Sequence, residues 1–303
     1  MSGRLLTPAT LAETCFLAYA DSTVLLADAA ALQRRRNEDG YVFARGVVPS
    51  AIIEPLYEQA AGVLVRWGVA ERDGRILRWT GVELPDYDPL DLYSLPALEE
   101  LSAADGFAPI CERLYGRRVW VGKNLIFFFA LPDDPAYITP PHRDAFGRAW
   151  FGEGDYCTLW VPLAGIDFAD GGLSLLPGSH RDAIPEYGDE RNDELPEYKG
   201  RRQIGRIPRA ERRASLGAGR GPKINAGHGL RLSIRDDEWL TGAFEPGDAL
   251  FFSADMIHCG LPLRSDTIRV SIAARVYPGE GERPHQIPLG ERLRRERAQL
   301  SSA

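Results

Sequence analysis

The sequence predicts a mainly β domain with flanking helices, built as a sandwich or jelly roll. The 303 residues are 44% hydrophobic and 26% charged, which is typical of a globular chain with enough apolar material for one sizeable core. Apolar residues recur at helical spacing in the first third of the chain, and short apolar runs separated by Gly, Pro and Asp follow. Several short strands with turns between them favour a sandwich or jelly roll over a parallel α/β sheet.

The expected elements follow in chain order. Residues 51–68 and 96–114 show the spacing of amphipathic helices. The aromatic run at 124–131 is bounded by Pro-Asp-Asp-Pro, which favours a buried strand. Further strands are expected at residues 156–163, 172–178, 248–254 and 268–277.

One long segment interrupts this β pattern. Residues 181–238 are charged and rich in Gly and Pro, first acidic and then basic. An insertion of this length in a compact domain is typical of an active-site lid, but a solvated surface loop explains it equally well. The arginines of its basic half could attract an anionic substrate, or they could be balanced by the preceding acids.

Charge and cysteine content limit the function classes. The net charge of −7 and the absence of a recognised nucleic-acid module argue against a nucleic-acid-binding protein, and no stretch is apolar enough for a membrane span or a signal peptide. Four scattered cysteines without metal-type spacing favour a reduced compartment, so we expect a soluble cytoplasmic protein. The oligomeric state is not predicted.

The first candidate site lies in the stretch PPHRDAF. His142 and Asp144 are two residues apart, so in an extended segment both side chains point to the same face, and Arg143 points away. Two histidines and one carboxylate form the facial triad of non-haem Fe(II) oxygenases. Alone, the pair could equally be an ordinary polar pair in a turn.

His258 is the best candidate for a third ligand. It follows the predicted strand at 248–254, whereas His180 ends a turn and His228 and His285 have no strand near them. Eleven residues after His258, strict alternation places Arg269, Ser271, Ala273 and Arg275 on one face of a strand. An arginine and a hydroxyl on one face could bind a carboxylate, although such a face could also be a plain outer surface.

Taken together, these motifs resemble the phytanoyl-CoA dioxygenase (PhyH-like) family of Fe(II)- and 2-oxoglutarate-dependent oxygenases. The family's GxLxxxPGSH segment is matched at residues 170–180, and its DGYVxxxGxxP segment at residues 39–49. The resemblance covers residues 37–278. The first 36 residues have no recognisable counterpart, so we expect a single domain over 1–303 with an N-terminal extension at 1–36 and the insertion at 181–238.

The resemblance implies a double-stranded β-helix, the cupin-like jelly roll, with N-terminal helices packing on one sheet. It also implies that His142, Asp144 and His258 bind iron and that Arg269, assisted by Ser271, binds the distal carboxylate of 2-oxoglutarate. Trp160 would form a wall of the site, and Asn124 could hydrogen-bond the cosubstrate. An Asn common in the family between the distal His and the Arg is absent from CGLPLRSDTI, which bears on local loop structure.

Such an enzyme uses O2 and 2-oxoglutarate to oxidise a C–H bond of a small molecule and releases succinate and CO2. Because Asp144 supplies a carboxylate, the resemblance favours hydroxylation, or the desaturation and ring-forming outcomes of related enzymes, over halogenation. Two alternatives stay open at this point: a cupin-type metal oxygenase that does not use 2-oxoglutarate, and a non-catalytic binding protein on the same fold.

Overall fold

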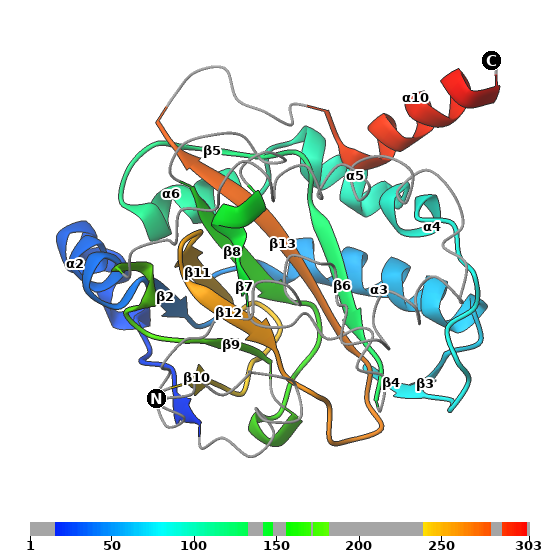
Figure 1. The fold of residues 1–303 in the computed structure, drawn as a ribbon, viewed down its shortest axis with the longest axis horizontal. Coiled ribbons are helices and arrows are strands. Elements are labelled where there is room, and N and C mark those ends of the chain that lie inside the picture. Colours follow the sequence, from blue (N-terminus) through cyan, green and yellow to red (C-terminus); the bar gives the residue numbers. More distant parts are fainter. Residues whose placement is uncertain are drawn as a thin grey trace, which may run out of the picture.

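Two β-sheets face each other, and helices cover the outer face of the larger one (Figure 1). The computed structural model describes residues 16–132, 142–147, 156–170, 172–181, 239–279 and 287–301. Most of the predicted insertion at 181–238 therefore lies outside the described residues, as do His228 and His285.

The larger sheet has the strand order β2-β11-β8-β13-β5, and β6 also pairs with β13. Its strands are β2 (Tyr41–Ala44), β5 (Val119–Val121), β6 (Ile126–Ala130), β8 (Cys157–Pro162), β11 (Ala249–Ser253) and β13 (Arg269–Pro278). The strands expected at 124–131, 156–163, 248–254 and 268–277 are thus confirmed. All strand pairs in this sheet are antiparallel, and β13 forms its centre because it pairs with β5, β6 and β8.

The smaller sheet has the order β1-β10-β9-β12-β7. Its strands are β1 (Leu17–Ala18), β7 (His142–Arg143), β9 (Leu173–Leu175), β10 (Leu240–Thr241) and β12 (Ile257–Gly260). Strand β9 confirms the strand expected at 172–178. Short 3-10 turns flank these strands: η1 (Thr23–Ala27), η3 (Asp144–Gly147), η4 (Phe168–Asp170) and η5 (Ser179–Arg181).

Alternation along the strands divides the apolar side chains of the larger sheet into two layers. Val42, Leu159, Phe251 and Ile272 belong to a core that the helices share. Their neighbours face the smaller sheet and form a second core with it, made up of Tyr41, Phe43, Trp160, Leu250, Phe252, Ala273, Leu175 and Leu240 among others. The molecule therefore has three layers, and in Figure 1 the strands β9 and β12 lie in front of β8 and β13, with α3 behind.

The helices are α2 (Ala29–Asp39), α3 (Ser50–Arg66), α4 (Leu90–Tyr93), α5 (Pro96–Ala103), α6 (Ala108–Tyr115) and α10 (Leu289–Ser301), and a small hairpin is formed by β3 (Ala70–Asp73) and β4 (Ile76–Trp79). Helix α3 confirms the helix expected at 51–68. It buries Ile53, Leu56, Ala60 and Leu64, which share one face at helical spacing.

The single helix expected at 96–114 is wrong, because the segment forms the two helices α5 and α6. After α5, Asp105 takes a left-handed conformation with φ of 48°, and the amide of Gly106 donates a hydrogen bond to the carbonyl of Leu101. This six-to-one bond is the Schellman arrangement that ends a helix. The apolar spacing continues across the break, so periodicity alone missed it.

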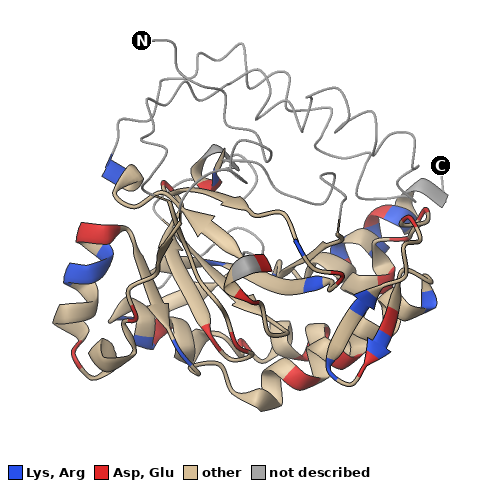
Figure 2. Ribbon diagram, turned by 90° about the horizontal axis from the view of Figure 1, so that it is seen from below, with Lys and Arg blue, Asp and Glu red and all other residues tan. Residues whose placement is uncertain are grey.

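The N-terminal segment is joined to the rest of the fold in the part that the structure describes. Strand β1 pairs in parallel with β10, and α2 crosses the boundary expected at residue 36. Charged residues of both signs are interspersed on the helices and on the β3–β4 hairpin, while the two large sheets carry few of them (Figure 2). Among the described residues, no helix has the length and hydropathy needed to cross a membrane.

Candidate metal and cosubstrate site

The three predicted metal ligands come together at one place between the sheets. His142 on β7 and His258 on β12 are direct register partners, and their ring centroids are 4.1 Å apart. Asp144 begins η3 immediately after β7, with Oδ1 3.7 Å from His142 Nε2 and Oδ2 3.8 Å from His258 Nε2. One ligand atom from each residue lies within 4.8 Å of the other two. This spacing and this donor set fit a single divalent metal such as iron(II).

The protonation states also suit metal binding. His258 Nδ1 lies 3.0 Å from the carbonyl oxygen of Met256, so Nδ1 carries the proton and Nε2 presents its lone pair. Burial, and then the neighbouring His142, lower the pKa of His258 to about 3, so its ring is neutral at neutral pH. Burial alone would raise the pKa of Asp144, but the Arg275 guanidinium and the two histidines outweigh it and hold this pKa well below its usual range.

Asp144 is held in place by two donors on the larger sheet and a third, Tyr156, immediately before β8. Arg275 Nη2 donates to Oδ1 over 2.8 Å, and Thr158 Oγ1 donates to Oδ2 over 2.5 Å. The Tyr156 hydroxyl donates to the backbone carbonyl of Asp144 over 2.6 Å. The carboxylate therefore has a fixed orientation, and its charge is partly balanced by a buried arginine.

Sequence reasoning missed these roles. Alternation places Arg275 on the same strand face as Arg269, and in the strand expected at 156–163 it places Thr158 on the same face as Trp160. That alternation placed the side chains on the correct faces. It could not show that Thr158 on β8 and Arg275 on β13 meet Asp144 at the start of η3, since Arg275 and Asp144 are 131 positions apart in the chain.

A pocket of about 80 Å³ opens beside the three candidate ligands. Its lining residues are Phe128, Phe129, Ala130, His142, Asp144, Thr158, Trp160, Leu173, Phe252, His258, Gly260, Arg269, Ser271, Ala273 and Arg275. The predicted face of β13 is confirmed, because its four alternate residues all line this pocket while Val270, Ile272, Ala274 and Val276 lie in the core beneath the helices.

Arg269 and Arg275 stand at opposite ends of this face, six residues or about 20 Å of strand apart. Arg275 is bound to Asp144, whereas Arg269 Nη1 donates to the carbonyls of Gly172 and Leu261. Burial lowers the pKa of Arg269 to about 10, so it stays a cation at neutral pH. The pocket thus has a metal-ligand end and a cationic end, with Ser271 beside the latter.

The other predicted residues are placed as follows. Trp160 lines the pocket wall and packs edge-on against Phe244, with ring centroids 5.0 Å apart. Asn124 is buried just before β6 but is not among the residues that line the pocket. His180 Nε2 hydrogen-bonds the carbonyl of Asn37, which agrees with the expected turn position. Arg143 is buried outside the pocket, as alternation predicted.

Comparison with known proteins identifies the family. The family model described as phytanoyl-CoA dioxygenase (PhyH) matches residues 36–271, which is more than half of the chain. The chain belongs to the phytanoyl-CoA dioxygenase family. The predicted resemblance is therefore confirmed, and this family member is an iron- and 2-oxoglutarate-dependent oxygenase. Membership argues against both alternatives, the cupin-type oxygenase without 2-oxoglutarate and the non-catalytic binding protein.

Two curated relatives are 1-deoxypentalenic acid 11-beta-hydroxylases. The protein from Streptomyces arenae is 28% identical over 276 residues, which cover 88% of each chain. The protein from Streptomyces exfoliatus is 25% identical over 273 residues, covering 88% of this chain and 87% of its own.

One similar solved structure is that of the epimerase SnoN in complex with Fe3+, alpha ketoglutarate and nogalamycin RO. It has a TM-score of 0.51 at 22% identity, covering 83% of this chain and 84% of its own. At that identity the likeness establishes the fold, and the predicted jelly roll of this family member is confirmed.

Proposed function

We propose that this family member hydroxylates an unactivated C–H bond of a small-molecule metabolite. In this proposal His142, Asp144 and His258 hold iron(II), and Arg269 with Ser271 binds the distal carboxylate of 2-oxoglutarate. The observation that carries it is a single pocket with a two-histidine, one-carboxylate set at one end and a buried cation with a hydroxyl at the other. Bound iron(II), 2-oxoglutarate and O2 supply the oxidising power, with release of succinate and CO2.

The residues of the chain have separate tasks. The three ligands would occupy three coordination positions of a bound iron(II) and would leave the remaining positions for the cosubstrate and O2. Asp144 fills the carboxylate position, so no ligand site is left for a halide, and this favours hydroxylation. Trp160, Phe128 and Phe252 give the pocket an apolar wall that excludes water from the reacting centre.

The apolar lining of the pocket and the activity named for the curated relatives indicate the class of substrate. An apolar wall suits a substrate with a hydrophobic or ring-bearing body. The curated relatives are hydroxylases named for 1-deoxypentalenic acid, which supports a small organic acid as substrate. A role for Asn124 in cosubstrate binding, a lid formed by residues 181–238, the separate extension at 1–36 and a cytoplasmic location stay predictions, as does the absence of nucleic-acid and membrane partners.

The test is anaerobic spectroscopy of the purified protein. With Fe(II) and 2-oxoglutarate together, the wild type should develop a visible metal-to-ligand charge-transfer band. The His142→Ala variant should lose the band. Arg269→Met should weaken 2-oxoglutarate binding by about tenfold or more, because it removes a charge-assisted hydrogen bond to the cosubstrate. Fe(II) binding should persist.

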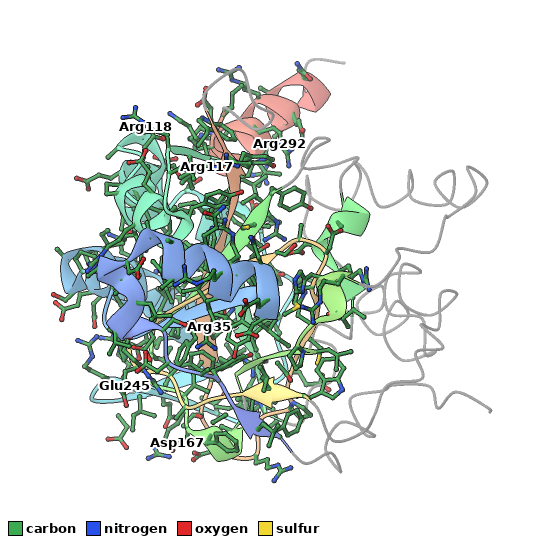
Figure 3. The ribbon with its side chains drawn as sticks, turned by 90° about the vertical axis from the view of Figure 1, so that its left-hand side faces the viewer. Arg35, Arg117, Arg118, Asp167, Glu245 and Arg292 are labelled. Atoms are coloured by element: carbon green, nitrogen blue, oxygen red, sulfur yellow. The ribbon has the colours of Figure 1, made fainter. Side chains whose placement is uncertain are left out.

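Arg117→Met is the control for a lost arginine. Arg117 is exposed and lies between α6 and β5. Strand β5 pairs with the end of β13 that is opposite to Arg269, and Figure 3 labels Arg117 close to Arg118. This variant should bind both ligands as the wild type does. A wild type without the band would contradict the metal site, and an Arg269→Met variant with wild-type affinity would show that a different residue binds the cosubstrate.

A further inference from the structure

The pairing that brings the two histidines together is very short. Strand β7 has two residues, and its register with β12 consists of His142 opposite His258 and Arg143 opposite Ile257. A slip of one residue would turn each side chain of β7 to the other face of the sheet and remove His142 from the pocket. Two ladder pairs are a weak constraint, so other contacts must fix the register.

The turn after β9 makes such contacts with Ile257, the residue before His258. The amide of Ile257 donates to Ser179 Oγ over 2.9 Å, and the carbonyl of Ile257 accepts from the amide of Leu176 over 2.9 Å. Ser179 Oγ in turn donates to the carbonyl of Leu176 over 2.7 Å. Both backbone groups of Ile257 are therefore bound by residues 176–179, with the Ser179 hydroxyl between them.

Ser179 also binds the segment that carries the other two candidate ligands, His142 and Asp144. Arg143 lies between His142 and Asp144, and its Nη2 donates to the backbone carbonyl of Ser179 over 2.9 Å. Arg143 is only 2% exposed and Ser179 is also 2% exposed, and neither lines the pocket. The paired residues Arg143 and Ile257 are thus joined through Ser179, on the side of the sheet away from the candidate ligands.

We propose that Arg143 and Ser179 are positioning residues that hold β7 in register with β12 and so set the separation of His142 and His258 before any metal binds. This inference rests on the proposed metal site. Neither residue contacts the metal in this scheme; each acts through the backbone of a ligand strand. The geometry of the facial triad then depends on a pair of buried polar contacts outside the pocket.

The experiment measures Co(II) binding to the metal-free, full-length protein, by titration and by the visible d–d absorption of the bound ion. Ser179→Ala removes the acceptor for the Ile257 amide, and Arg143→Met removes the guanidinium. Each should lower Co(II) affinity by about 10- to 100-fold and change the d–d spectrum, as does the loss of a group that orients a metal ligand. The double variant should lose less than the product of the single losses, because both contacts serve one register.

Ser174→Ala is the matched control. Ser174 is also a fully buried serine of the smaller sheet, and its Oγ donates to a backbone carbonyl, that of Leu240, over 2.8 Å. Its loss should cost stability but leave Co(II) affinity and spectrum unchanged. Ser179→Thr keeps the hydroxyl and should restore wild-type binding, which a merely space-filling role of this side chain would not explain.

The outcomes separate the two proposals. Folded Ser179→Ala and Arg143→Met variants with wild-type affinity and spectrum would overturn the positioning role and leave the metal site standing. A wild type that does not bind Co(II) would overturn the metal site and the positioning role with it. If Arg143→Met fails to fold, Ser179→Ala decides, because it removes one oxygen atom and leaves every charge in place.

Discussion

Three hydrogen-bond donors surround Asp144, one of the three candidate ligands. Each of its carboxylate oxygens has its own donor, Arg275 for Oδ1 and Thr158 for Oδ2, and its backbone carbonyl accepts from Tyr156. A buried carboxylate without such partners would be costly to keep ionised. These contacts keep Asp144 charged and oriented, which is what binding to a divalent metal requires.

Thr158→Val tests this support at the level of one atom. Valine keeps the branched shape but lacks the hydroxyl that orients Oδ2, so we expect Co(II) affinity to fall by about tenfold, with the fold intact. Titration of the metal-free protein would measure the change. Thr241→Val is the control, since Thr241 is equally buried and its hydroxyl donates to the carbonyl of Leu173. Equal affinities of the two variants would contradict the assigned role of Thr158.

Strand β13 is the element on which the site and the core meet. Its Val270, Ile272, Ala274 and Val276 side chains belong to the core beneath the helices. Its other face carries the pocket residues, with small Ala273 between Ser271 and Arg275. The small side chain leaves space along the strand between the cationic end and the metal-ligand end.

Leucine substitutions at Ala273 and at Ala274 should distinguish the effects of the pocket face of β13 from those of its core face. Ala273→Leu would fill the pocket. Because a bulky side chain then blocks a preformed site, we expect 2-oxoglutarate affinity to fall by about tenfold or more, while Co(II) still binds. Ala274→Leu would overpack the opposite core and lower the free energy of unfolding by about 1–3 kcal/mol. Urea denaturation and ligand titration of both variants measure these effects. Wild-type cosubstrate binding by Ala273→Leu would show that this space is not used.

At the scale of the whole molecule, the site depends on both sheets. The three candidate ligands come from β7, η3 and β12, while the groups that hold Asp144 come from β8 and β13 of the facing sheet. The two sheets are joined by an aromatic core in which Phe244 contacts Trp160, Phe43 and Tyr19. A metal bound to the three ligands would therefore stabilise the contact between the sheets as well as the site.

Metal binding should accordingly raise global stability. At a free Co(II) concentration of about 100 times its dissociation constant, the free energy of unfolding should increase by about 2.7 kcal/mol. Chemical denaturation with and without Co(II) measures the difference, and removal of the metal by a chelator should reverse it. The His142→Ala variant should show little or no gain. A gain of equal size in that variant would place the stabilising ion elsewhere.

Most of the candidate site could be predicted because its signals are local. The spacing of His142 and Asp144 and the alternation from Arg269 to Arg275 depend on the two-residue period of extended chain, which a few residues determine. The ordered motifs extended these signals to a family, and the match over residues 36–271 confirmed it. The helix break at Asp105 escaped prediction because the apolar spacing runs on across it while a single left-handed residue ends α5.

What only the tertiary structure decided is which polar groups from distant parts of the chain meet, between the two sheets and within the smaller one. The contacts of Arg275 with Asp144 and of Arg143 with Ser179 join residues 131 and 36 positions apart. The position of Asn124, buried but outside the pocket, likewise appears only in the folded chain. Sequence alone determined the donor chemistry and the faces on which the side chains lie. The pairing of those faces depends on sheet packing, which is a sum of many distant contacts and leaves no local pattern in the chain.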